Sequence, residues 1–144
     1  IKNSNLKAII LYNVTGELAT NLNFLSGCTE LTKIDIRGWK NLSDISGIKD
    51  FKKVTYLNFS DCHVVNLNAI KDYKLLRTLD LSNNSLDIDI YDDEINDTVN
   101  NVDILVQLNK NNLTELYLLG NKFRDTSGLQ VLKKTVTTSS YIPL

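Results

Sequence analysis

Residues 87–97, DIDIYDDEIND, hold the densest set of side chains that could do chemistry, with six carboxylates in eleven positions. Carboxylate oxygens are the ligands that calcium and magnesium prefer, so this segment could form a cation site. It lacks the D-x-[DN]-x-[DN]-G order and the central glycine of a calcium-binding loop. We therefore interpret it as a helix start with a solvated loop, and we expect no metal and no cofactor.

The adjacent residues Cys62 and His63 are the other combination that suggests catalysis, and His63 is the only histidine. Neighbouring residues near a strand end point in opposite directions, so Cys62 should be a buried structural thiol while His63 faces outward. The sequence contains no zinc-ligand cluster, no G-x-x-x-x-G-K loop and no G-x-S-x-G motif. It therefore predicts a protein that is not an enzyme and has no small-molecule substrate.

The length and the net charge of the chain exclude further classes of protein. The chain has 144 residues, the size of one ordinary domain, and 16 basic and 17 acidic residues give a net charge of −1. This balance predicts no general affinity for nucleic acid, and no apolar run reaches the roughly 20 residues that a membrane-spanning helix needs. The first residue is Ile1 and the chain contains no methionine, so we expect a fragment of a longer protein.

A repeated spacing of apolar residues determines the fold, and the fold positions the side chains described above. The pattern L-x-x-L-x-L-x-x-N-x-L is complete in residues 76–86 and recurs, with substitutions, from residues 6, 31, 54 and 113. Further apolar residues lie nine, six and three positions before the starts at 31, 54 and 76. Self-similarity at a period of about 22 residues indicates a leucine-rich repeat.

The spacing predicts an α/β fold, a right-handed leucine-rich repeat solenoid over residues 1–144 as a single domain. Each L-x-L places two side chains on one face of a short strand, and about five such strands should stack into a concave parallel sheet. Asparagine at the ninth position can bond the backbone of adjacent repeats, and helical or 3-10 turns should close the convex side. Residues 133–144 are expected to form a partial sixth repeat or a cap.

Two departures from the repeat lead to specific expectations. The repeat that starts at Leu31 has one extra residue before Leu42, which Gly38 could absorb as a bulge that turns Trp39 outward. An insertion occupies about residues 87–109, where apolar residues follow a helical spacing and carboxylates precede them. We predict a convex-side helix over residues 93–108. Cys28 and Cys62 should lie on coils too far apart for the Cα separation of about 5.5 Å that a disulfide requires.

With motifs such as NLSDISGIKDF and DTSGLQVL, residues 6–132 resemble the internalin-like group of bacterial leucine-rich repeat proteins. The resemblance implies a secreted or surface-attached module that binds another protein and does not insert into a membrane. A cytoplasmic regulatory or scaffold subunit, as in phosphatase regulators, and a purely structural spacer remain compatible, because one fold serves many partners.

The strand positions that point away from the core predict where a partner binds. Tyrosine and arginine dominate binding hot spots, and here they stand on a face that solubility alone would keep polar. The predicted partner-binding residues are Tyr12, Lys33, Asp35, Arg37, Trp39, Tyr56, Asn58, Asp80 and Tyr117. The alternative is a face that is polar only for solubility.

Overall fold

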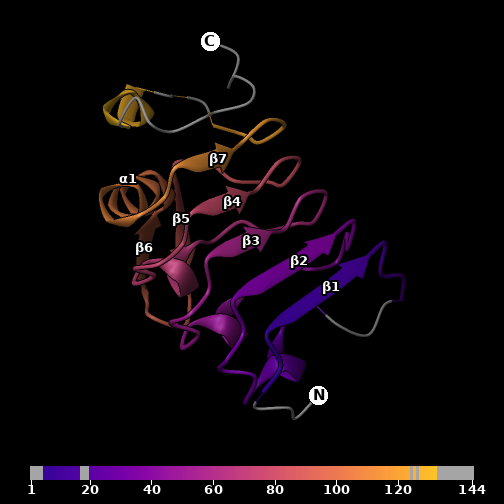
Figure 1. Cartoon of the computed structure of the whole chain (residues 1–144). Coiled ribbons are helices and arrows are strands. Elements are labelled where there is room, and N and C mark those ends of the chain that lie inside the picture. The colour runs from indigo at the N-terminus through magenta and orange to yellow at the C-terminus, as the bar shows by residue number, and fades with distance from the viewer. Residues whose placement is uncertain (1–4, 17–19, 124, 126, 133–144) are drawn as a thin grey trace.

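The computed structural model describes residues 5–16, 20–123, 125 and 127–132. Its main sheet is parallel, with the strand order β1-β2-β3-β4-β7, so that successive coils lie side by side (Figure 1). The strands are β1 (Ala8–Tyr12), β2 (Lys33–Arg37), β3 (Tyr56–Asn58), β4 (Thr78–Asp80) and β7 (Glu115–Tyr117). The predicted α/β leucine-rich repeat solenoid is confirmed. The predicted sixth repeat or cap over 133–144 lies outside the described residues.

The five strands pair in a single register. Aligned residues share one position of the repeat, and their side chains are buried in the core: Ile9, Ile34, Leu57, Leu79 and Leu116. A slip of one residue would turn this row to the outer face, so burial fixes the pairing. The face of the sheet that points away from the core is called the concave face below.

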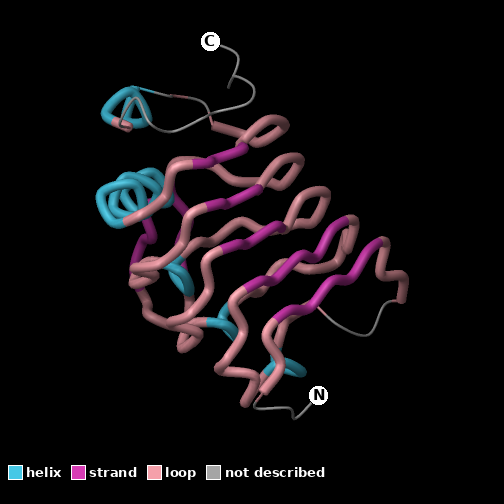
Figure 2. Tube along the Cα trace, in the orientation of Figure 1, coloured by secondary structure: helices cyan, strands magenta, loops and turns pink. Residues whose placement is uncertain are grey.

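Short 3-10 helices lie on the other side of the coils (Figure 2): η1 (Asn23–Leu25), η2 (Ser46–Ile48), η3 (Asn68–Ile70) and η4 (Ser127–Val131). A carboxylate or amide oxygen two residues before each turn's first residue accepts from its backbone N–H, as Asp44 Oδ1 does from Ser46 at 2.8 Å. Asn21, Asn66 and Asp125 repeat this contact. The apolar residues expected to close the coils are buried, as predicted: Leu22, Leu25, Cys28, Ile45, Ile48, Phe51, Leu67, Ile70 and Tyr73.

After each strand the chain turns through one residue with positive φ. These residues occupy the same position of successive repeats: Asn13 (φ 51°), Gly38 (72°), Asp61 (56°), Asn83 (55°) and Gly120 (77°). Glycine, asparagine and aspartate tolerate this left-handed conformation best. Gly38 therefore fills an ordinary turn position, and the predicted bulge is wrong. The extra residue is accommodated after Trp39, where the Leu42 N–H donates to the Trp39 carbonyl at 3.0 Å.

Because the register continues past Gly38, Trp39 occupies the ninth position of its repeat and points into the core. Only 4% of it is exposed, and its ring lies 6.0 Å from that of Phe24. The expectation that Trp39 faces outward is therefore wrong. Its Nε1–H has no hydrogen-bond partner among the described residues.

The other ninth-position residues tie neighbouring coils together, as the repeat predicts. Asn84 Nδ2 donates to the carbonyl of Phe59 at 2.8 Å, and Asn84 Oδ1 accepts from the Val64 N–H at 2.8 Å. Asn121 makes the equivalent bonds to Leu81 and Leu86. In the coil before Asn84, the Cys62 thiol approaches the Ile36 carbonyl at 3.7 Å. Cysteine thus keeps one contact of the ladder.

The insertion is a hairpin followed by a helix. Strands β5 (Asp89–Asp92) and β6 (Asp97–Asn100) pair antiparallel, and α1 (Asn101–Asn111) begins only after them. The predicted helix over 93–108 is therefore wrong in its first half, and the carboxylates from Asp92 to Glu94 lie at the hairpin tip instead of at a helix start. The helix begins here because Asn100 Oδ1 caps it, accepting from the Asp103 N–H at 2.9 Å.

Asn101 joins the insertion to the neighbouring coil. This side chain is fully buried, accepts from the Leu67 N–H at 3.0 Å and donates to the Val65 carbonyl at 2.9 Å. It also donates to the Asp87 carbonyl at 3.0 Å. The contacts satisfy backbone groups of two distant segments at once, so they fix where the hairpin and helix sit on the coil.

Candidate protein-binding face

Side chains on the concave face stand in columns, because the parallel register aligns equivalent residues of adjacent strands. Tyr12 of β1 is paired with Arg37 of β2, and Lys33 of β2 with Tyr56 of β3. Ile10 and Tyr12 on β1 are both more than half exposed. The face therefore combines aromatic, apolar and cationic groups at the end formed by β1, β2 and β3.

Tyr12, Asp35 and Arg37 form one connected cluster. Arg37 donates from Nε to Asp35 Oδ1 at 2.7 Å and from Nη2 to Asp35 Oδ2 at 2.8 Å. The guanidinium carbon of Arg37 lies 5.2 Å from the centre of the Tyr12 ring, and the Tyr12 hydroxyl donates to Asp35 at 3.4 Å. Hydrogen bonding to Asp35 raises the pKa of Arg37 further above its usual value, so its positive charge is permanent.

Lys33 and Tyr56 make a second cationic-aromatic pair beside this cluster. The Lys33 ammonium lies 4.8 Å from the centre of the Tyr56 ring. Such pairs are attracted because the face of an aromatic ring carries partial negative charge. Both side chains are half-buried, so each is partly held by its neighbours and partly open to solvent. Tyr117, another predicted residue, is half-buried on β7 at the far end of the sheet.

The aligned residues of strands β2, β3 and β4 on this face, Asp35, Asn58 and Asp80, make hydrogen bonds within the protein. Asp35 is 1% exposed and Asn58 is 3% exposed, so the expectation that they offer exposed contacts is wrong. Asn58 Oδ1 accepts from the Ser60 N–H at 2.8 Å, and the half-buried Asp80 accepts from the Ser82 N–H at 3.0 Å. These side chains satisfy the backbone at the strand ends.

The strand periodicity places Ile10 and Leu119 on the outer face of the sheet, although neither belongs to the predicted partner-binding set. The structure leaves both among the exposed large apolar residues. Ile10 precedes Tyr12 by two residues on β1 and so extends the apolar surface of the Tyr12–Arg37 end.

Cys62 and His63 face apart, as the sequence predicts. Cys62 is buried and His63 is exposed, with its Nδ1 3.3 Å from the Ser85 hydroxyl. Burial raises the pKa of the Cys62 thiol to about 11, which makes it a poor nucleophile at neutral pH. Cys28 is likewise a buried thiol.

Two further properties concern only the described part of the chain. No group of three or more histidine, cysteine, aspartate or glutamate side chains is arranged to hold a metal ion there. None of the helices in these same residues is both long enough and apolar enough to cross a membrane.

Comparison with known proteins agrees with this geometry. The Leucine Rich Repeat family model matches residues 75–97, which include β4 and the first strand of the insertion. Together with the parallel sheet and its repeated turns, this match defines a leucine-rich repeat protein.

The crystal structure of an internalin (inlF) from Listeria monocytogenes is similar, with a TM-score of 0.67 and 26% sequence identity. The alignment covers 85% of this chain and 32% of that chain, so the chain spans about a third of that internalin's length. No curated protein matches the sequence. The chain therefore has a leucine-rich repeat fold similar to that of an internalin, and its repeats and fold support a role as a protein-interaction module.

Proposed function

We propose that the chain is a non-enzymatic module of a secreted or surface-attached bacterial protein, and that it captures a partner protein through its concave face. The observation that carries this proposal is the Tyr12–Arg37 pair, an exposed aromatic ring beside a permanent positive charge. The secreted or surface location is supported by the resemblance to the internalin-like group.

Pre-organisation favours this end of the sheet as a binding site. Binding normally costs about 0.5–1.5 kcal/mol for each flexible side chain that becomes ordered. The bidentate contact with Asp35 already orders Arg37, and Tyr12 contacts both the Arg37 guanidinium and the Asp35 carboxylate. Tyr12 and Arg37 are residue types that dominate binding hot spots. Because folding already orders both side chains, a partner would lose little further side-chain entropy on binding them.

The dimensions of the face fit part of an interface. Five strands about 4.8 Å apart span about 20 Å, and standard interfaces bury about 800 Å² on each partner. The exposed residues Ile10, Tyr12 and Arg37, with Lys33 and Tyr56 beside them, would form the anchor. Asp35, Asn58 and Asp80 would support it from within the sheet.

The test compares two tyrosines of equal exposure on opposite sides of the molecule. Tyr12 is 55% exposed on the concave face, and Tyr91 is 56% exposed on the insertion. A photo-crosslinking amino acid is placed at each position, and proteins that become linked are identified from surface extracts of the source cells. We expect specific partners to be linked from position 12. In pull-downs without the crosslinker, Tyr12→Ala and Tyr56→Ala should capture the same partners about tenfold more weakly.

Tyr91→Ala is the matched control and should capture these partners normally, with all variants keeping the parent's thermal midpoint. Loss of capture in Tyr91→Ala, combined with normal capture in Tyr12→Ala and Tyr56→Ala, would show that the concave face is the wrong surface. Normal capture by all three variants would favour a structural spacer.

A further inference from the structure

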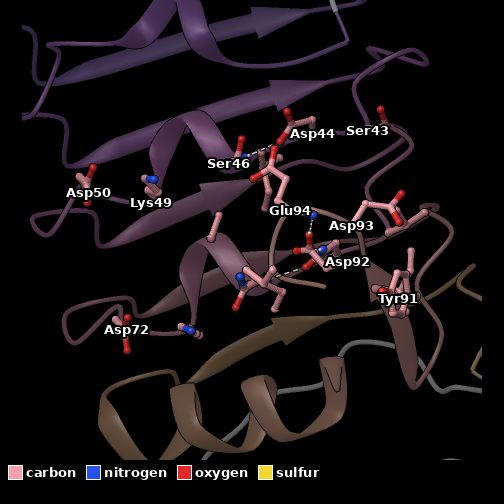
Figure 3. Close-up of a pocket in the computed structure, with 18 of the residues that line it drawn as sticks. Ser43, Asp44, Ser46, Lys49, Asp50, Asp72, Tyr91, Asp92, Asp93 and Glu94 are labelled. Atoms are coloured by element: carbon pink, nitrogen blue, oxygen red, sulfur yellow. Dashed lines mark hydrogen bonds between the residues drawn. The ribbon is translucent and has the colours of Figure 1, made fainter. Parts of the chain in front are cut away.

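A groove of about 500 Å³ lies on the side of the coils opposite the concave face (Figure 3). One wall is formed by the turns around η2 and η3, and the other by residues 90–95 of the inserted hairpin. The volume falls within the range of about 300–1,000 Å³ that is typical of binding pockets. The groove depends on the insertion, because a regular repeat would have no hairpin here.

The hairpin wall is fixed to the coil beneath it. Asn66 Nδ2 donates to Asp92 Oδ2 at 2.8 Å, while Asp92 Oδ1 accepts from the Glu94 N–H at 2.9 Å. Both oxygens of Asp92 are therefore used in holding the hairpin tip, and the buried Asn101 anchors its base. The groove is consequently a formed feature that does not have to be opened by a ligand.

One end of the groove carries negative charge that the described residues do not neutralise. Asp44 on the coil and Asp93 and Glu94 on the hairpin all line this end of the groove (Figure 3). None of these three carboxylates takes part in an ion pair within the described part of the chain. Carboxylates that line one end of a groove without a counter-charge attract a cationic group, so such a group bound there would be favoured.

The same groove has apolar surface. Val65, Ala69 and Ile90 are half-buried in its lining, and Ile95 at the hairpin tip is 49% exposed. A bare metal ion would gain nothing from these side chains. A peptide that carries both cationic and apolar side chains would use the two kinds of surface together.

We propose that this groove binds a linear segment of a partner protein in which lysine or arginine residues alternate with apolar residues. The cationic side chains would contact Asp44, Asp93 and Glu94, and an apolar neighbour would pack between Ile95 and Ala69. Lys49, Asp50 and Asp72 lie at the other end of the groove (Figure 3), so the charge there is mixed and the cationic part of the segment lies at the hairpin tip. This second surface is independent of the concave face.

The probe is a fluorescein-labelled six-residue peptide with alternating lysine and leucine, and binding is followed by fluorescence anisotropy. We expect micromolar affinity at 50 mM NaCl and at least threefold weaker binding at 300 mM, because exposed charges are screened. Replacing the lysines by glutamate, or the leucines by glycine, should weaken binding at least tenfold.

Two double variants with equal charge change separate the groove from general attraction. Asp93→Asn with Glu94→Gln should weaken peptide binding about tenfold. Asp89→Asn with Asp97→Asn changes the same hairpin at exposed residues outside the groove lining, and it should bind as the parent does. Ile95→Ser should weaken binding at least threefold, whereas Tyr12→Ala on the concave face should have no effect.

Equal loss in the two double variants would overturn the proposal, because attraction would then be non-specific. The proposal would also fail if the parent bound neither this peptide nor its arginine version, or if Ca²⁺ alone bound at Asp93 and Glu94 while the peptide did not. Each of these results leaves the concave-face proposal unaffected.

Discussion

Arg37 donates two hydrogen bonds to Asp35, at 2.7 and 2.8 Å. The Asp35 side chain is only 2% exposed, whereas the Arg37 side chain is 45% exposed. One residue of this pair belongs to the surface and the other to the interior. Arg37 therefore serves both as a candidate contact for a partner and as the counter-charge of a buried carboxylate. Stability and binding are coupled at this position.

Arg37→Ala is expected to lower the free energy of unfolding by about 1–3 kcal/mol, because it leaves a buried charged acceptor without its donor. Adding Asp35→Asn should recover part of this loss, since a neutral amide is less costly to bury unpaired. Urea unfolding at pH 7 measures both effects, with Lys33→Ala on the concave face as a control that should change little. An unchanged midpoint for Arg37→Ala would contradict this assignment, and Tyr12→Ala is the cleaner test of binding.

Asn84→Ala should lower the free energy of unfolding by at least about 1–3 kcal/mol. The change removes the acceptor for the Val64 N–H and the donor to the Phe59 carbonyl. Asn84→Cys should cost less, since Cys62 keeps the equivalent contact to Ile36 in the neighbouring coil. Chemical denaturation compares these variants with Asn23→Ala, an exposed asparagine on η1. If all three midpoints agree, the ladder does not hold the coils together.

The repeat could be predicted from the sequence because burial sets its spacing. Leu57 and Leu79 must face inward for the strands to pair, so an alternation of apolar residues determines the sheet and its register. The inward position of Trp39 could also have been predicted, by comparing Gly38 with the residues at the same position of the other repeats. Gly38 shares its repeat position with Asn13, Asp61, Asn83 and Gly120, and this column of turn-forming residues identifies an ordinary turn.

The insertion and the groove could not be predicted in the same way. Val99 and Val102 fit a helical spacing, yet Val99 lies on a strand, since short apolar runs do not distinguish the two structures. The contact between Asn66 and Asp92 joins segments 26 residues apart without any repeat to indicate it. The Tyr12 hydroxyl likewise reaches Asp35 from another strand.

Cys62 should react slowly with iodoacetamide in the native protein, because desolvation by burial raises its pKa from 9.0 to about 11. At pH 8 the thiolate population is then about 100-fold smaller than for an ordinary thiol. The rate, measured by peptide mass spectrometry, should rise with pH up to about 11 and should be much faster in guanidinium chloride. Equal rates in native and denatured protein would show that this thiol is accessible.

The same shift affects stability at alkaline pH. The folded state keeps the Cys62 proton above the pKa of the unfolded thiol, so its contribution is complete below pH about 9 and is lost as pH rises towards about 11. Burial also raises the pKa of Tyr73, which acts in the same direction. Thermal midpoints of the parent should therefore fall over this range, and those of Cys62→Ala should fall less.

Trp39→Phe should lower the free energy of unfolding much less than the smaller buried area of the phenylalanine ring would suggest. The indole Nε1–H is buried without a partner among the described residues, and an unsatisfied buried donor costs about 1–3 kcal/mol. Phenylalanine removes this donor and keeps most of the packing against Phe24, whereas Trp39→Ala leaves a cavity and should cost about 3–5 kcal/mol. Urea unfolding followed by circular dichroism measures both variants, because neither retains the single tryptophan. Equal losses for Trp39→Phe and Trp39→Ala would mean that the Nε1–H makes a bond essential to the fold.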